Sequence, residues 1–276
     1  MPFLAVVSYP DPHGPNTVRA PYDRMFNHLR FLAPRTYGRD DLPSPGWLGG
    51  GKNHAVFRGE QMSLYFGMVK CIDDNVGRLL QALEEDNELE STIVLMTSDH
   101  GDLCYEHDRL NKGNPYEGSA RVPMLIRYPK RLRGGHVYSR PVGTVDVTPT
   151  LLGLADVSHQ SAMQGRDLSN RLEGGEGQGS RGDDIVFLRN AGTRANWVAA
   201  IDDRYKLVLS ANDRPWLFDY ESDPDELLNF FDRPGTAGAT KRLADALAAY
   251  AAKSEDPYFS DKNITASLQQ CRAIKP

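Results

Sequence analysis

The sequence is poor in cysteine, in long hydrophobic runs and in blocks of like charge. Its 276 residues hold three cysteines at wide spacing, Cys71, Cys104 and Cys271, which supports neither a disulfide framework nor a structural zinc site. No apolar run reaches the roughly 18 to 20 residues that a membrane helix needs. The formal charge of -5 includes no like-charge tail. We therefore expect a small, specific ligand as partner, with no nucleic acid and no membrane.

The remaining composition is ordinary for a globular protein, with 40% hydrophobic and 25% charged residues. The length predicts one large unit and one smaller unit, which we place at residues 1–172 and 183–276. The chain enters a strand-like run at once and shows no basic leader, so no export signal is expected and no compartment can be assigned. This abrupt start predicts that the first element lies inside a sheet and that more sequence once preceded it.

The first half of the chain alternates strand-like and helical patterns. Phe3–Tyr9 is a β-branched apolar run that predicts a buried strand, and 20–57 has the Pro, Gly and aromatic content of a long functional loop. Apolar residues at three- and four-residue steps predict one helix over 59–86. Thr92–Thr97 predicts a second buried strand, so the strand, helix, strand order implies a parallel crossover and an α/β fold.

The second half predicts a small antiparallel sheet. Before it, a strand is expected at 123–128, a short helix at 146–155 and a glycine-rich linker at 174–182. The helix that covers the sheet should contain Leu243 and Leu247. Four strand-like runs are expected: Ile185–Arg189, Asn196–Ile201, Arg204–Ser210 and Pro215–Tyr220, with a tight turn at Asp202-Asp203.

Polar clusters follow the first two predicted strands, where ligands gather in open α/β sheets. His13 stands between prolines after the first strand, and Asp99 and His100 follow the second. A carboxylate and an imidazole side by side, with Gly101 allowing a sharp turn, predict half of a metal site. Taken alone, each cluster is more often a solvated or hydrogen-bonded loop than a ligand set.

The loop after Asp99 and His100 strengthens the prediction. It carries His107 and Lys112, and a lysine beside a metal can neutralise an anionic substrate oxygen. His107 either lines the substrate pocket or orients the loop by hydrogen bonding. Glu117 and Arg121 lie one helical turn apart, and we expect an ion pair between them that holds the lysine-bearing loop.

These segments, in this order, resemble the type I, formylglycine-dependent sulfatases, the arylsulfatase branch of the alkaline-phosphatase-like superfamily. The resemblance covers nearly the whole chain. It rests on Val7-Ser8-Tyr9 with Pro12-His13-Gly14-Pro15, Tyr65 to Leu83, Thr97 to Gly101, Asn111-Lys112-Gly113, Tyr116 to Pro123, Asp146 to Leu152, Asp203 to Leu207, Leu217-Phe218-Asp219 and Asp223-Pro224.

The resemblance implies a fold, a cofactor and a set of roles. The fold would be part of an alkaline-phosphatase-like mixed sheet with flanking helices, followed by a small C-terminal antiparallel sheet with a helix. Asp99 and His100 would bind a divalent cation, calcium above all, with manganese or zinc as alternatives. His13 and Lys112 would act in catalysis by contacting the sulfate and its leaving oxygen, and His107 would contact the substrate, a small sulfated aryl or sugar compound.

One departure from the family pattern matters as much as the match. The family nucleophile is a formylglycine made from a Cys/Ser-x-Pro-x-Arg motif, and no cysteine or serine of this sequence supplies that motif. The chain therefore resembles the C-terminal portion of a sulfatase, and we expect it to be catalytically incomplete by itself. Two alternatives stay open: a phosphomonoester or phosphonate monoester hydrolase, and a non-catalytic protein that binds an anion or pairs with a separate N-terminal sulfatase segment.

Overall fold

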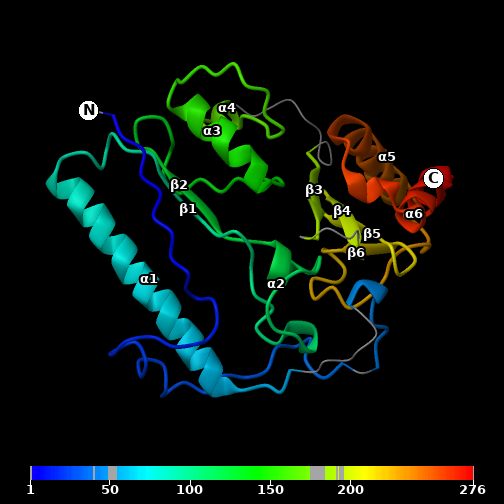
Figure 1. Cartoon of the computed structure of the whole chain (residues 1–276), viewed down its shortest axis with the longest axis horizontal. Helices are drawn as coiled ribbons and strands as arrows, with labels where there is room; N and C mark the ends of the chain where they lie inside the picture. Colours follow the sequence, from blue (N-terminus) through cyan, green and yellow to red (C-terminus); the bar gives the residue numbers. More distant parts are fainter. Residues whose placement is uncertain are drawn as a thin grey trace.

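The computed structural model describes residues 2–39, 41–48, 55–174, 184–190, 192 and 196–275. Its secondary structure is α/β, as predicted, and comprises two antiparallel sheets with flanking helices (Figure 1). In chain order the elements are α1 (Gly59–Glu85), β1 (Val94–Thr97), α2 (Glu117–Ala120), β2 (Met124–Arg127), α3 (Val147–Leu154), α4 (Ser169–Leu172), β3 (Val186–Arg189), β4 (Trp197–Ile201), β5 (Tyr205–Ser210), β6 (Trp216–Asp219), α5 (Ala237–Ser254) and α6 (Lys262–Ala273). Among the described residues no helix is both long and apolar enough to cross a membrane.

The helices and strands predicted after residue 58 are confirmed in position, but β1 is not the buried strand that was expected, since Met96 is 39% exposed. Helix α1 ends at Glu85, and Asn87, two residues later, has a left-handed φ of 58° that keeps the helix from continuing. Helix α3 begins after Asp146, whose carboxylate accepts a hydrogen bond from the Gly143 backbone N–H at 3.0 Å. Most of the linker predicted at 174–182 lies outside the described residues, and α6 is a helix that the sequence patterns did not indicate.

The N-terminal run is where the sequence prediction fails. Residues 2–10 form no strand, and the apolar side chains of Leu4 and Val6 are 88% and 85% exposed. Because residues 2–10 form no strand, the predicted parallel crossover to β1 is also wrong, and β1 instead pairs with β2 in antiparallel register, Val94 opposite Arg127. The physical reason is a lack of tertiary neighbours. A buried strand needs an edge partner and apolar cover on both faces, and no described segment gives these to residues 2–10.

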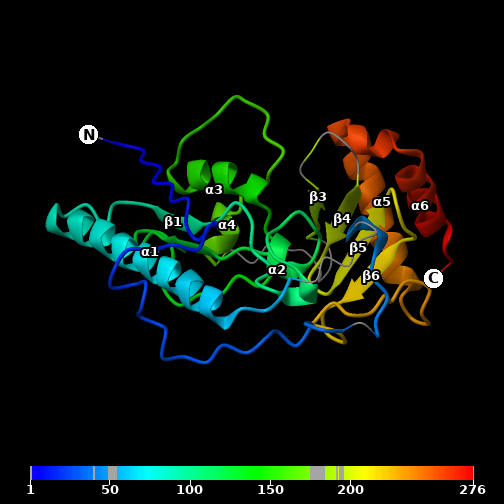
Figure 2. The same ribbon diagram turned by 60° about the horizontal axis from the view of Figure 1, so that its bottom comes forward.

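The C-terminal sheet has the order β3-β4-β5-β6 and is covered on both faces. Helices α5 and α6 pack against β4 and β5 on one face (Figure 2). The alternation of a strand sends Leu207 and Leu209 to that helix-covered face and Val208 to the other. On the second face, Val208 packs in a cluster with Trp47, Leu103 and Tyr116. The sheet therefore supports the loop region after β1.

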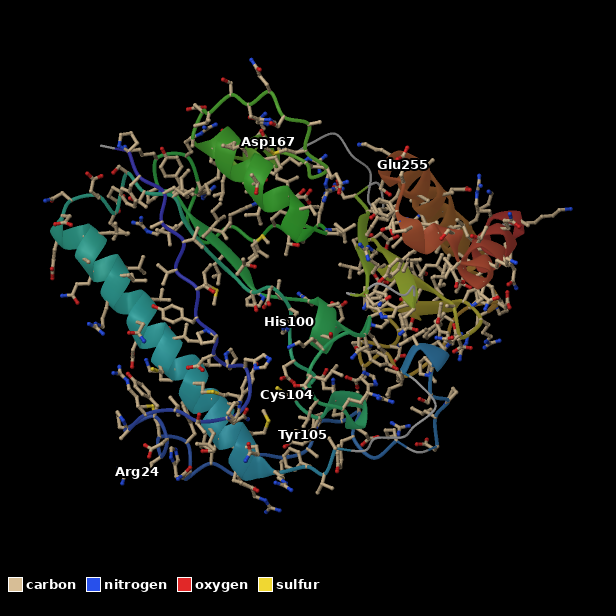
Figure 3. The ribbon with its side chains drawn as sticks, viewed as in Figure 1. Arg24, His100, Cys104, Tyr105, Asp167 and Glu255 are labelled. Carbon is tan, nitrogen blue, oxygen red and sulfur yellow. The ribbon has the colours of Figure 1, made fainter. Side chains whose placement is uncertain are left out.

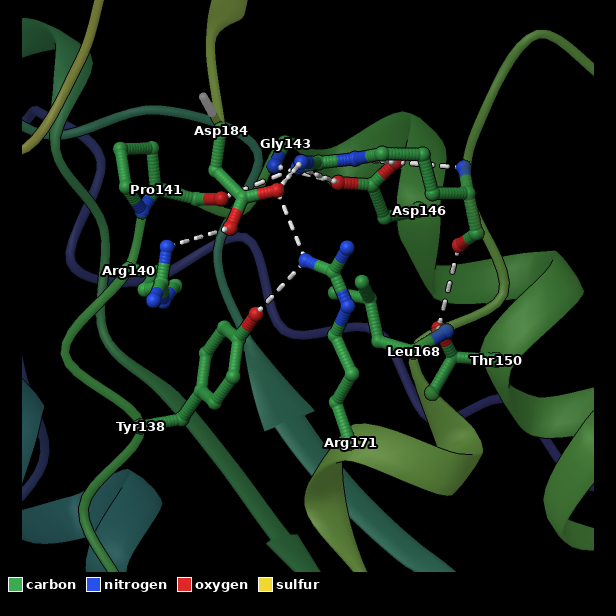
Figure 4. Close-up of polar contacts among 10 residues, drawn as sticks. Tyr138, Arg140, Pro141, Gly143, Asp146, Thr150, Leu168, Arg171 and Asp184 are labelled. Carbon is green, nitrogen blue, oxygen red and sulfur yellow. Dashed lines mark hydrogen bonds and ion pairs between the residues drawn. The ribbon is translucent and has the colours of Figure 1, made fainter. Parts of the chain in front are cut away.

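A network of charged residues joins the region around α3 and α4 to the chain just before β3 (Figure 4). Asp184 is almost buried and accepts from three guanidinium groups, those of Arg140, Arg166 and Arg171, at 3.3, 2.9 and 2.7 Å. Arg166 also binds the buried carboxylate of Asp146 at 2.8 Å. Burial alone would raise the pKa of Asp184, but the arginines hold it below its usual value. The carboxylate is therefore ionised and ties the segments together.

Candidate functional site

Asp99 and His100 lie together at the end of β1. Asp99 Oδ2 is 3.4 Å from His100 Nε2, and the Asp99 side chain is 82% exposed. His100 Nδ1 is 2.8 Å from the Gly101 carbonyl oxygen, which can only accept, so Nδ1 carries the proton. Nε2 is then the ring nitrogen that faces the carboxylate. This arrangement of a fixed tautomer and an adjacent carboxylate is typical of histidine prepared for a metal ion.

Electrostatics favours the ionised form of Asp99. Partial burial works against its charge, but the neighbouring His100 ring and the hydrogen bonds from the His100 backbone N–H and the Ser98 hydroxyl lower the pKa below its usual value. Within the described part of the chain, no group of three or more His, Cys, Asp or Glu side chains could hold a metal. Asp99 and His100 together offer two such side chains, fewer than a group of this kind contains.

His13 repeats the arrangement of His100. Its Nδ1 donates to the Gly14 carbonyl oxygen at 2.7 Å, and its backbone N–H donates to the Pro10 carbonyl oxygen at 3.1 Å. The side chain is exposed. Its Nε2 is thus the acceptor nitrogen in the neutral ring, as general acid–base chemistry through that atom requires.

The loop from Leu103 to Asn111 is tightly closed and strained. Asp102 Oδ1 accepts from the backbone N–H groups of Cys104 and Asn111, both at 2.9 Å, and Leu103 N–H donates to the Asn111 carbonyl oxygen at 2.9 Å. The non-glycine residues in the left-handed region within this loop are Cys104, Tyr105, His107, Asp108 and Asn111. Such conformations cost energy and cluster at functional sites. Figure 3 shows His100, Cys104 and Tyr105 along this part of the chain.

His107 lies at the inner side of the loop. Its ring stacks on Tyr116 with ring centroids 3.7 Å apart and planes 7° apart, and its backbone N–H donates to Thr36 Oγ1 at 3.0 Å. Burial lowers the pKa of His107 to about 4, so the ring is neutral at pH 7. It lines a cavity together with Arg39 and Arg109. Of the two roles left open by the sequence, the geometry gives His107 a position at a cavity wall.

Lys112 lies at the outer side of the loop and is exposed. It lines a second cavity with Arg109, Asn111 and Asn114, against Trp47 and Leu48 of the long N-terminal loop region. Lysine and arginine are both present there and no carboxylate is among the described residues that line it, so this cavity suits an anion. Sequence reasoning missed Arg109, which borders both cavities, because nothing in the pattern distinguishes it from a solvated loop arginine.

Helix α2 is held by a buried lysine that the sequence did not reveal. Lys206 is 0% exposed, and its Nζ binds Glu226 at 2.7 Å, Glu117 at 2.8 Å and the Pro115 carbonyl oxygen at 2.5 Å. The expected Glu117–Arg121 ion pair is therefore wrong, because Glu117 turns to Lys206 in the interior. Burial disfavours the ammonium, but the two carboxylates raise the pKa of Lys206 above its ordinary value.

Four of the five predicted site residues fall into two groups in the structure, and His13 belongs to neither. Asp99 and His100 form one pair, and His107 and Lys112 line neighbouring cavities that share Arg109 and Leu48. Within the described ranges, no hydrogen bond or ion pair joins His13 or Lys112 to Asp99 or His100. A single cavity shared by all four remains a prediction.

The profile of the sulfatase family matches residues 1–157, which is more than half of the chain. A second profile, that of the C-terminal region of N-sulphoglucosamine sulphohydrolase, matches residues 105–253. The chain belongs to the sulfatase family. One similar relative is the uncharacterized sulfatase YidJ of Escherichia coli, 30% identical over 94% of this chain and 53% of the relative. This sulfatase chain thus spans about half the length of the curated relatives it matches.

Solved structures agree with the sulfatase assignment. A complex of a protein with its substrate D-glucosamine-2-N,6-O-disulfate is 28% identical with a TM-score of 0.63, covering 75% of this chain and 42% of that one. The phosphonate monoester hydrolase of Silicibacter pomeroyi is 25% identical with a TM-score of 0.71, covering 90% and 56%. The alkaline-phosphatase-like fold expected from the sequence is therefore confirmed.

Proposed function

We propose that this chain provides the cation-binding and leaving-group side of a site that hydrolyses sulfate esters. Asp99 and His100 bind a divalent cation, calcium above all. Lys112 and His13 contact the sulfate and the departing oxygen, and His107 forms part of the substrate pocket wall. The observation that carries the proposal is the 3.4 Å approach of Asp99 Oδ2 to His100 Nε2, with Nδ1 fixed on a backbone carbonyl.

The donor set fits part of a cation site. Calcium takes about six to eight oxygen ligands, whereas Asp99 and His100 offer at most two carboxylate oxygens and one nitrogen. When bound, the cation would stabilise negative charge on the transferring sulfuryl group. The residues of this chain then have three tasks. Lys112 binds an anionic oxygen, His13 transfers a proton at Nε2, and the neutral His107 ring limits water access at the wall.

We further propose that polypeptide outside these 276 residues supplies the nucleophile and the other cation ligands. The sequence has no Cys/Ser-x-Pro-x-Arg motif, and the matched relatives are about twice as long. Burial supports the same view. In the described part of the chain every large exposed hydrophobic side chain lies at or before Val157, within the region matched by the sulfatase profile; among them are Leu4, Val6, Phe66 and Leu125. An apolar surface of this kind is typical of an interface with another polypeptide segment.

The second candidate is a phosphonate monoester hydrolase, favoured by the Silicibacter pomeroyi neighbour with the TM-score of 0.71. The substrate class of the first candidate is a small sulfated sugar or aryl compound, supported by the neighbour solved with a disulfated glucosamine. Both substrates present a tetrahedral anion to the same lysine and cation. Rates with a chromogenic aryl sulfate and an aryl phosphonate ester distinguish the two candidates.

Calcium calorimetry tests the cation site of this chain. We expect weak binding, with a dissociation constant of roughly 10⁻⁴ M or weaker, because so few ligands are present. Asp99→Ala should abolish it. Asp73→Ala is the matched control, since it removes a carboxylate that pairs with Lys70 on α1. Sub-micromolar affinity that survives Asp99→Ala would place the ion elsewhere and end the assignment.

Hydrolysis tests the other half of the proposal. The chain alone should release no more product from a chromogenic aryl sulfate than buffer does, because it lacks a nucleophile. Co-expression with the nucleophile-bearing N-terminal half of a similar sulfatase should restore turnover, and Lys112→Ala should remove it again. Turnover by the isolated chain that Lys112→Ala abolishes would refute the need for a second segment.

A further inference from the structure

Ser119 of α2 contacts two glycines, each next in the chain to a candidate site residue. Its carbonyl oxygen accepts from the Gly101 backbone N–H at 2.9 Å, and its Oγ accepts from the Gly113 backbone N–H at 3.1 Å. Gly101 directly follows His100, and Gly113 directly follows Lys112. Ser119 is 4% exposed, so water does not compete freely for these bonds. One buried residue therefore joins the Asp99–His100 turn to the lysine-bearing loop.

The contact between α2 and the Asp99–His100 turn is close and rigid. A Cβ atom added at Gly101 would lie 2.2 Å from the Gly118 carbonyl oxygen, so the two backbones touch with no room for a side chain. Helix α2 is itself held on the C-terminal sheet, since Lys206 binds both Glu117 and the Pro115 carbonyl oxygen. Helix α2, which carries the Ser119 contacts to both glycines, is thus fixed on the C-terminal sheet.

The join on the side of Lys112 depends on one hydroxyl. Gly113 has a φ of 93°, and its N–H is held by the Ser119 Oγ. On the other side of the same residue, the Gly113 carbonyl oxygen accepts from Trp197 Nε1 at 3.2 Å. Ser119→Ala would remove the first of these bonds and keep the Ser119 carbonyl that holds Gly101. The substitution therefore frees one group of site residues while leaving the other in place.

We propose that Ser119 is a positioning residue, whose hydroxyl sets the place of Lys112 relative to the Asp99–His100 pair. The inference rests on the proposed function, in which the pair binds a cation and Lys112 binds the anion. Its chemical reason is that charge stabilisation needs the lysine and the cation at fixed positions around one tetrahedral group, and a displacement of about 1 Å can cost roughly 100-fold in rate.

The first test needs no ligand. Backbone amide exchange and the Trp197 indole N–H resonance are compared by NMR in the unaltered protein, Ser119→Ala and Thr240→Ala. Thr240→Ala is the matched control, because it removes a buried hydroxyl that donates to the Thr236 carbonyl oxygen in α5. We expect Ser119→Ala alone to speed exchange at Gly113 by about tenfold, to shift the Trp197 signal, and to leave Gly101 unchanged.

The second test measures the coupling between the two groups. Sodium sulfate is titrated with and without Ca²⁺ while the Lys112 amide and Trp197 indole signals are followed. In the unaltered protein and in Thr240→Ala, Ca²⁺ should tighten sulfate binding by about fivefold or more. In Ser119→Ala that gain should disappear, although sulfate binding without Ca²⁺ stays similar, because Lys112 is present but no longer held in place.

The outcomes separate the inference from the proposed function. If Ca²⁺ does not affect sulfate binding in the unaltered protein, the shared cation–anion site fails, and the exchange data still decide whether Ser119 fixes the loop. If Ser119→Ala matches Thr240→Ala at Gly113 and Trp197, or keeps the full Ca²⁺ gain, the positioning role is overturned.

Discussion

Replacing the buried Lys206 with methionine should strongly destabilise the protein. The substitution keeps the length and apolar stem of the side chain but removes the cation that Glu117 and Glu226 share. Glu226 is 3% exposed and has its pKa raised by burial, so its charge depends on the ammonium. Removing one partner of a buried ion pair typically costs about 3 to 5 kcal/mol, and we expect a loss in that range.

Urea unfolding followed by tryptophan fluorescence measures this loss. Trp47, Trp197 and Trp216 all lie in the cluster on the face of the sheet toward which Lys206 points, so the probe reports the affected region. Lys241→Met is the matched control, because the Lys241–Asp245 pair on α5 is about 40% exposed and should contribute no more than about 1 kcal/mol. Adding Glu226→Gln to Lys206→Met should recover part of the stability, since it removes the more buried of the two stranded charges.

A loss of less than about 1 kcal/mol in Lys206→Met, comparable to that of Lys241→Met, would refute this reasoning. It would mean that water or neighbouring groups compensate Glu117 and Glu226 without the lysine. Helix α2 would then need another explanation for its fixed position on the sheet.

Two further predictions concern His107 and Gly101, which lie in the segment that follows β1. Burial holds the pKa of His107 at about 4 in the folded protein, whereas the value in the unfolded chain is near 6.5. Between these pH values the unfolded state therefore binds one more proton than the folded state. The contribution of the neutral His107 to folding stability is complete above pH 6.5 and falls by at most about 3 kcal/mol as the pH drops to 4. His107→Gln should remove that part of the pH dependence in urea unfolding, and an unchanged profile would contradict the assignment. Gly101→Ala should destabilise by roughly 1 to 3 kcal/mol, because its Cβ would meet backbone atoms of Gly118. Gly77→Ala, with open space in α1, should be neutral or stabilising, and equal effects of the two substitutions would show that the contact is not tight.

The local elements and the kinds of side chain at the candidate site could be predicted from the sequence alone. Periodic apolar spacing placed α1 within one residue, because it reflects which face of the helix is buried, and short strand-like runs bounded by turn residues placed β3 to β6. The pairing of Asp99 with His100 was also predictable, since adjacent residues before a glycine can turn together. The ordered motifs were enough to indicate the sulfatase family.

The tertiary structure was needed for the features that depend on contacts between residues far apart in the sequence, namely burial of the strand-like run and the choice of ion-pair partners. Phe3–Tyr9 has the composition of a buried strand, but pairing and burial require neighbours that local sequence cannot show, and the run is exposed. Glu117 has Arg121 one turn away, yet it binds Lys206, which is 89 positions later in the chain, because strand alternation turns that lysine toward α2. Ser119 likewise gained its two contacts from loops that are separate in sequence. Spacing predicts neighbours along a helix or strand, whereas packing of the sheet against the loops selects the partners that hold the site.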